Sequence, residues 1–243
     1  MFCFITTLPL VHVLREVDSD VRPSMPLLYE MMDSAKEKIA DACGGIERKY
    51  MPYWKLVDKR WSGMMHRPIH AAAYYLNPKY FYGDKFSKNP EVRKGLIECM
   101  ARMIPNVDER AQADYELDAY KERLGEFGSE MALRTLAFRT PAYWWERFGD
   151  ETPSLQRFAV RILSLTTSSS GCERNWSTFE QVHSKKRCRL EQERLNSLVY
   201  VMYNIKLRER NMRRKARKLD PILLEEASTD DEWIVEEEDP CLP

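Results

Sequence analysis

Ser170 and Glu173 form a pair whose residue types and spacing could support chemistry. A glutamate can bind a divalent metal ion, but one carboxylate alone is not sufficient for metal-dependent catalysis. The same spacing fits a capping box, in which the serine oxygen accepts a backbone N–H of the first helical turn and the glutamate accepts the serine N–H. Capping accounts for both residues, and we predict that a helix begins here.

His66 and His70 have the i, i+4 spacing of two zinc ligands on a helix. However, no glutamate follows His66, and Pro68 is expected to begin a helix between the two histidines. We therefore interpret both as core or surface residues and predict no metal site and no cofactor. The six cysteines form no CxxC pair, which favours reduced, intracellular thiols.

An apolar seam follows along the predicted helix that starts near Glu191. Its residues recur at steps of three and four, as in helices that pack on other helices: Leu195, Leu198, Val199, Met202 and Ile205. Trp176 and Phe179 share one face of the preceding helix. The seam could pack on these two aromatic residues within the chain, or it could contact a second subunit.

A basic segment at residues 206–218 continues this helix, and it contains the cluster Arg213, Arg214, Lys215, Arg217 and Lys218. It could be a solvated helix end, a nuclear import signal or a patch that contacts phosphates. The chain as a whole has no net charge, which excludes a general attraction to nucleic acid or to an anionic membrane. Trp144 and Trp145 could stack on bases, but packing in a core is the favoured interpretation.

Helical patterns dominate the elements that must position these residues, so the predicted fold class is mainly α. Helices are expected at residues 8–17, 25–43, 47–61, 69–76, 90–103, 108–124, 129–138 and 141–148. The apolar start of the chain is too short to span a bilayer and lacks a signal-peptide pattern, so no membrane contact is predicted. Residues beyond about 219 are acidic and poor in apolar residues, and we expect disorder there.

The segment SSSGCERNWSTFEQVHSKKRCRLEQERLNSLVYVMYNIKL, residues 168–207, resembles the C-terminal dimerisation segment of hAT-type transposases, in the plant branch often associated with a DUF659 region. Residues 60–82 resemble the family's helical insertion. The resemblance implies that the seam self-associates, and it places Glu173 on the last acid of the catalytic triad of an RNase-H-like domain. In the family, the first two aspartates lie on strands, whereas Asp18, Asp20 and Asp33 lie in helical or turn patterns. Glu173 is therefore predicted to be vestigial.

Together these observations predict a truncated hAT transposase, domesticated or decayed, that is not an enzyme. The expected domains are a helical region resembling the insertion domain (1–138), the dimerisation region (139–210) and a basic, then acidic, largely disordered tail (211–243). The helices would be remnants of the insertion and the C-terminal part of an incomplete RNase-H-like fold. The predicted function is dimerisation, with itself or a related hAT-derived protein. The alternative is a nucleic-acid-binding nuclear regulator that uses residues 206–218. The expected location is the nucleus, otherwise the cytoplasm.

Overall fold

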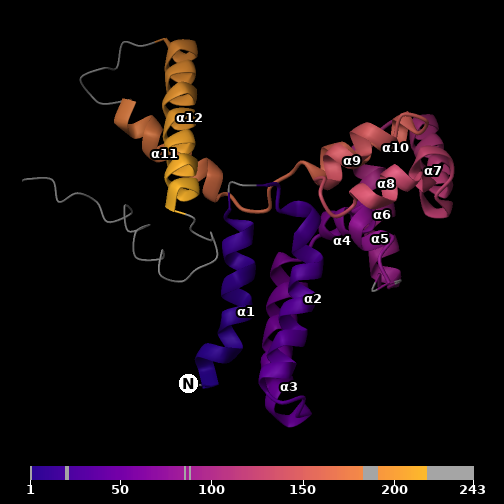
Figure 1. Ribbon diagram of the computed structural model, residues 1–243, viewed down its shortest axis with the longest axis horizontal. Coiled ribbons are helices and arrows are strands. Elements are labelled where there is room, and N and C mark those ends of the chain that lie inside the picture. The colour runs from indigo at the N-terminus through magenta and orange to yellow at the C-terminus, as the bar shows by residue number, and fades with distance from the viewer. Residues whose placement is uncertain (1, 20–21, 85, 88, 183–190, 218–243) are drawn as a thin grey trace, which may run out of the picture. The chain divides into compact units, whose positions relative to one another are not determined.

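The computed structural model describes residues 2–19, 22–84, 86–87, 89–182 and 191–217. These residues form helices and connecting turns, and no strand occurs among them (Figure 1). The helices are α1 (Phe2–Val17), α2 (Met25–Ala42), α3 (Glu47–Arg60), the π-helix η1 (Trp61–Met65), α4 (Pro68–Leu76), α5 (Pro78–Phe81), α6 (Pro90–Met103), α7 (Val107–Glu122), the 3-10 helix η2 (Gly125–Gly128), α8 (Glu130–Thr135), α9 (Pro141–Phe148), α10 (Pro153–Leu163), α11 (Ser170–Val182) and α12 (Gln192–Arg217). The prediction of a mainly α fold is confirmed.

The chain divides into two compact units, Met1–Ser168 and Ser169–Pro243. The first unit includes α9 and α10, whose apolar residues share one core with α4, α6 and α7. The boundary predicted at residue 138 would separate α9 and α10 from that core. The structural division therefore falls later in the chain than the sequence prediction placed it.

Aromatic residues fill the core of the first unit. Trp144 and Trp145 on α9 are almost fully buried and pack around Tyr120 and Phe127. Each indole N–H is satisfied: Trp144 Nε1 donates to the Ala132 carbonyl at 2.9 Å, and Trp145 Nε1 donates to the Leu76 carbonyl at 2.8 Å. Buried indoles with paired N–H groups fix the position of α9 against its neighbours.

Helices α4 and α6 approach closely because both present small residues at their contact. Ala71, Ala72 and Ala73 of α4 are fully buried, and Gly95 of α6 lies against them. A Cβ atom placed on Gly95 would lie 2.7 Å from the Ala71 Cβ and 2.9 Å from the Pro68 carbonyl oxygen. Only glycine fits at this crossing without displacing one of the helices.

Helices α1, α2 and α3 form the N-terminal part of the same unit. Val13, Leu28 and Ala35 are the buried residues between α1 and α2. Helix α2 ends where the sequence pattern predicts, and Gly44 and Gly45 follow it with φ angles of 70° and 68°. Glycine adopts this left-handed conformation without the cost that a Cβ atom imposes, which lets the chain turn back into α3.

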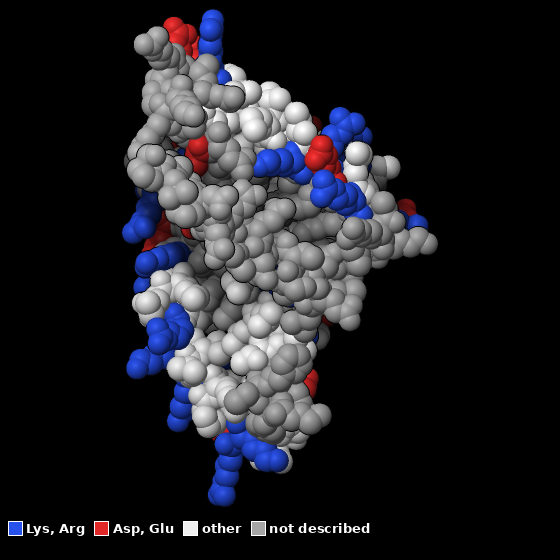
Figure 2. All heavy atoms as spheres, turned by 90° about the vertical axis from the view of Figure 1, so that its left-hand side faces the viewer, with Lys and Arg blue, Asp and Glu red and all other residues white. Residues whose placement is uncertain are grey.

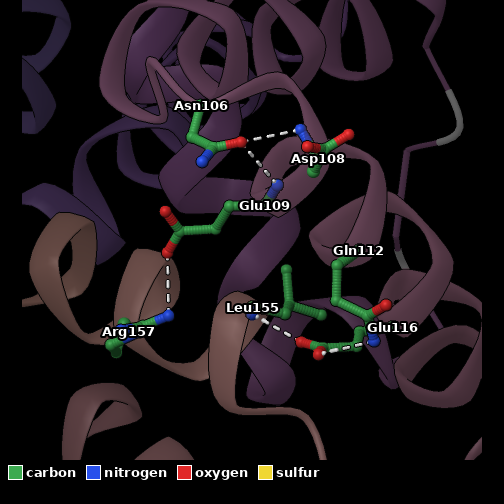
Figure 3. A network of polar contacts seen from close by, with 7 residues as sticks. All are labelled: Asn106, Asp108, Glu109, Gln112, Glu116, Leu155 and Arg157. Carbon is green, nitrogen blue, oxygen red and sulfur yellow. Dashed lines mark hydrogen bonds and ion pairs between the residues drawn. The ribbon is translucent and has the colours of Figure 1, made fainter.

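A buried carboxylate joins α7 to α10 (Figure 3). Glu116 of α7 is 5% exposed, and its Oε2 accepts the backbone N–H of Leu155 at 2.7 Å in the first turn of α10. Its other oxygen accepts a hydrogen bond from Gln112 Nε2 at 3.1 Å. Thr152, which precedes α10, makes no side-chain capping bond. Glu116 therefore caps α10 from a different helix, where the unpaired N–H groups and the helix dipole favour a negative charge.

Several element predictions need correction. Helix α10 occupies residues 153–163, where the sequence pattern predicts no helix, and α1 begins at Phe2 rather than at the predicted residue 8. Residues 211–217, assigned to the tail, continue α12, whereas residues 218–243 lie outside the described part of the chain. Within the described residues, no helix is long and apolar enough to cross a membrane.

Candidate dimerisation surface

Helices α11 and α12 of the second unit pack against each other as a helix hairpin. Val182 of α11 is buried with Leu195 and Val199 of α12, and Phe179 and Met202 pack against these three. Leu195 is only 2% exposed. One face of the predicted seam is therefore covered by the chain's own preceding helix.

A second apolar row on α12 remains exposed, and we call it the outer stripe. Its members and their exposed fractions are Leu198 (39%), Val201 (50%), Ile205 (52%) and Met212 (56%). Because successive helical residues are rotated by about 100°, the outer stripe lies about 100° around α12 from the row that faces α11. The steps of three, four and seven between its members are those of a surface that packs on another helix.

Trp176 adds an exposed aromatic side chain on α11. It is 67% exposed, and its ring lies 6.1 Å from the Phe179 ring, which packs on the hairpin core. Large exposed aromatic side chains are enriched at protein interfaces, where they are buried on association.

The residues predicted for dimerisation thus separate into two sets. Phe179, Leu195, Val199 and Met202 pack within the chain, whereas Trp176, Leu198 and Ile205 are exposed. The interpretation of the seam as an intrachain contact holds for the first set, and contact with a second subunit stays a prediction for the second set. Periodicity alone missed Val201 and Met212, although Met212 lies seven residues after Ile205.

Glu173 lies in the first turn of α11 and takes part in local bonds. Its carboxylate accepts a hydrogen bond from the Ser169 hydroxyl at 2.8 Å, and its backbone N–H donates to the Ser169 carbonyl at 3.0 Å. The helix begins at Ser170, so Ser169 precedes it, one residue earlier than the predicted capping box requires. Both contacts are those of a residue that stabilises a helix start.

The basic segment is helical as far as Arg217, and Lys218 lies outside the described residues. Arg213 is exposed, with its guanidinium 3.7 Å from the Glu209 carboxylate. The side chains of Arg214, Lys215 and Arg217 are not described. Figure 2 shows Lys and Arg side chains at several places on the described part of one face, with few Asp and Glu side chains among them.

The other candidate residues for chemistry lie in the first unit. Trp144 and Trp145 are buried, so their predicted alternative role as base-stacking platforms is wrong. His66 follows η1 and His70 lies in α4, with ring centroids 5.9 Å apart. Burial lowers the pKa of His70 to about 4, and its Nδ1 accepts the Arg67 backbone N–H. Among the described residues, no group of three or more His, Cys, Asp or Glu could hold a metal ion.

These features define a helical protein with a helix hairpin whose outer face is apolar. Residues 116–205 match the sequence model of the hAT family C-terminal dimerisation region. This match confirms the resemblance to the hAT C-terminal dimerisation region, and it suggests a role in self-association. The matched segment begins at Glu116, which caps α10, and ends at Ile205 of the outer stripe. No curated protein and no solved structure matches the chain.

Proposed function

We propose that this protein is a dimerisation module and that two copies associate through the outer stripe of α12, with Trp176 nearby on α11. The single observation that supports this proposal best is the exposed row Leu198, Val201, Ile205 and Met212, most of which lies within a segment that matches a dimerisation region. Exposed apolar side chains on one face of a helix are stabilised when a partner removes them from water.

Sedimentation tests the proposal with a charge placed on the outer stripe. The double variant Leu198→Asp with Ile205→Asp is expected to sediment as a monomer at concentrations where the parent protein is a dimer, because burial of an unpaired carboxylate strongly disfavours association. Both residues are exposed, so the hairpin core of Leu195 and Val199 is left intact.

A matched control adds the same charge elsewhere on α12. Asn196→Asp with Tyr200→Asp changes two exposed residues about 160° to 200° around the helix from Leu198 and adds the same two negative charges. This control is expected to remain a dimer. A parent protein that is monomeric at every concentration, or a control that dissociates as readily as the stripe variant, would contradict the proposal.

We also propose that the protein does not catalyse strand transfer. Support comes from Glu173, whose described contacts belong to a helix start, and from Asp33, which lies within α2 rather than on a strand. Purified protein is expected to show no metal-dependent nicking of DNA. Nicking that is lost in Glu173→Gln would contradict this.

A second candidate function is contact with nucleic acid through the basic end of α12, which would also suit a nuclear protein. Seven basic residues and one acid between Lys206 and Arg217 favour phosphate binding over sequence recognition. The test is the salt dependence of DNA binding, and the affinity should fall steeply as the salt concentration rises. Reversing the charges of Arg208 and Arg213 should make the affinity depend less steeply on salt. Binding unaffected by these changes would remove this candidate.

A further inference from the structure

The charge of α12 is distributed unevenly between its two halves. This asymmetry favours one relative orientation of the two α12 helices in a dimer. Residues 192–205 contain one acid, Glu193, and one base, Arg194, so this half has no net charge. Residues 206–217 contain seven basic residues and one acid, a net charge of +6. The outer stripe extends across both halves, from Leu198 to Met212.

Packed helices lie about 8–10 Å apart, close to the screening length of about 8 Å at physiological salt. Two parallel copies of α12 would place the two strongly basic halves side by side, where like charges repel. Two antiparallel copies would place each basic half beside a neutral half. The apolar contact is available in both orientations, so the charge distribution selects between them.

We propose that two copies of α12 pair in antiparallel orientation about a two-fold axis at Ile205. The inference rests on the proposed function and adds to it the orientation and register of the interface. Leu198, Ile205 and Met212 are separated by equal intervals of seven residues. Reversal of the helix about Ile205 therefore exchanges Leu198 with Met212 and places Ile205 beside Ile205, as a self-complementary two-fold interface requires, and it brings Val201 to the level of Glu209.

The same register places Glu193 of each copy at the level of Arg217 of the other. The only acid of the neutral half then lies toward the basic end of the second helix, whereas in the parallel orientation it lies beside another Glu193. The two basic ends project in opposite directions from the paired region.

Single cysteines on the outer stripe test this arrangement in the full chain. The background replaces Cys3, Cys172, Cys188 and Cys241 with serine and keeps the buried thiols Cys43 and Cys99. Its sedimentation must match that of the parent. Leu198→Cys, Ile205→Cys and Met212→Cys are then oxidised separately, and Leu198→Cys is also co-expressed with Met212→Cys.

The antiparallel register predicts a specific pattern of covalent dimers. Ile205→Cys should cross-link with itself, and the co-expressed pair should cross-link, whereas Leu198→Cys alone and Met212→Cys alone should not. In either single variant, the cysteine of one subunit and the same cysteine of the second subunit would lie about 21 Å apart along the helix axis. Positions 198 and 212 are separated by fourteen residues, and each residue of an α-helix rises about 1.5 Å. A disulfide requires Cα atoms within about 7 Å.

The alternative outcomes separate this inference from the proposed function. Cross-linking of Leu198→Cys and Met212→Cys each with itself, with no product specific to the mixture, would show a parallel dimer and overturn the orientation alone. A dimer by sedimentation that gives no cross-link at any stripe position would overturn this interface. If the parent protein and the four-serine background are both monomeric, the proposed function and the inference are both wrong.

Discussion

Glu116 shows how one buried carboxylate can join two helices. Replacement by alanine leaves the Leu155 N–H of α10 without its acceptor inside the core. Loss of a buried hydrogen bond to a charged group costs about 1.5–3 kcal/mol. We therefore expect Glu116→Ala to lower the free energy of unfolding by about that amount. The measurement is urea denaturation followed by the fluorescence of the core tryptophans Trp144 and Trp145.

Glu109 provides the control on the same helix. Its carboxylate lies 2.8 Å from the Arg157 guanidinium of α10, but both side chains are substantially exposed. Exposed ion pairs contribute roughly 0–1 kcal/mol. Glu109→Ala should therefore change stability much less than Glu116→Ala, and equal losses would show that capping by Glu116 is not what joins α10 to α7.

His70 makes the stability of the first unit depend on pH. Burial, followed by the neighbouring His66 and Arg67, lowers its pKa from 6.5 to about 4, so the unfolded chain binds a proton more readily than the folded one. The contribution of neutral His70 to the free energy of unfolding is therefore fully present above pH 6.5. It is lost as the pH falls toward 4, and the loss is at most about 3 kcal/mol. His70→Gln retains an acceptor for the Arg67 N–H but cannot titrate, so its denaturation midpoint should vary less between pH 6.5 and 4. A parallel loss in both proteins would assign the pH dependence to other groups.

For single residues, the sequence indicates which side chains could be buried or take part in chemistry, but it does not show which groups surround them. The core interpretation of Trp144 and Trp145 was available from their flanking residues, and burial confirms it. Glu116 could not be found in this way, because its buried position depends on α10, which lies 39 residues away in the chain. Nothing in the local pattern of α7 distinguishes this acid from its exposed neighbours.

Gly95 tests the packing of one element on another. Within an exposed helix, replacing glycine with alanine raises stability by about 1 kcal/mol. At the crossing of α4 and α6 the added methyl group would collide with Ala71 and the Pro68 carbonyl. We expect Gly95→Ala to lower the free energy of unfolding by about 1–3 kcal/mol, as for other overpacked cores, measured by the same denaturation experiment.

Gly63 in η1 is the matched control, because a Cβ atom placed there meets nothing within 4 Å. Gly63→Ala should leave stability unchanged or slightly higher. If both substitutions stabilise the protein, the close approach of α4 and α6 is more tolerant than the geometry indicates.

Helices with a proline or serine near the start and a regular apolar row were well predicted. Residues 90–103 and 141–148 match α6 and α9 at both ends. Helix α10 has the same features, with Pro153 at its start and Leu155, Phe158 and Ile162 buried, and was nevertheless missed. The seam of α12 shows a deeper limit: spacing identifies an apolar face, but only the position of α11 shows which residues are covered within the chain.

Across the whole molecule, the two units differ in how much apolar surface they bury. The first has an extensive aromatic core, whereas the described core of the second consists of Val182, Leu195 and Val199 with Phe179 and Met202 beside them. A pair of helices with so small a core is only marginally stable on its own. We therefore expect association to contribute much of the stability of α12.

Hydrogen exchange measured at several protein concentrations tests this expectation. If α12 opens only in the monomer, its amides should exchange about threefold more slowly for each tenfold rise in concentration once dimers predominate, because the monomer fraction then falls as the square root of concentration. Amides of α6 and α10 belong to the first unit and should be unaffected. In Leu198→Asp with Ile205→Asp the exchange of α12 should be fast and independent of concentration. Equal slowing of α6 and α12 in the parent would instead place the association in the first unit, and no slowing of α12 would mean that the hairpin is stable without a partner.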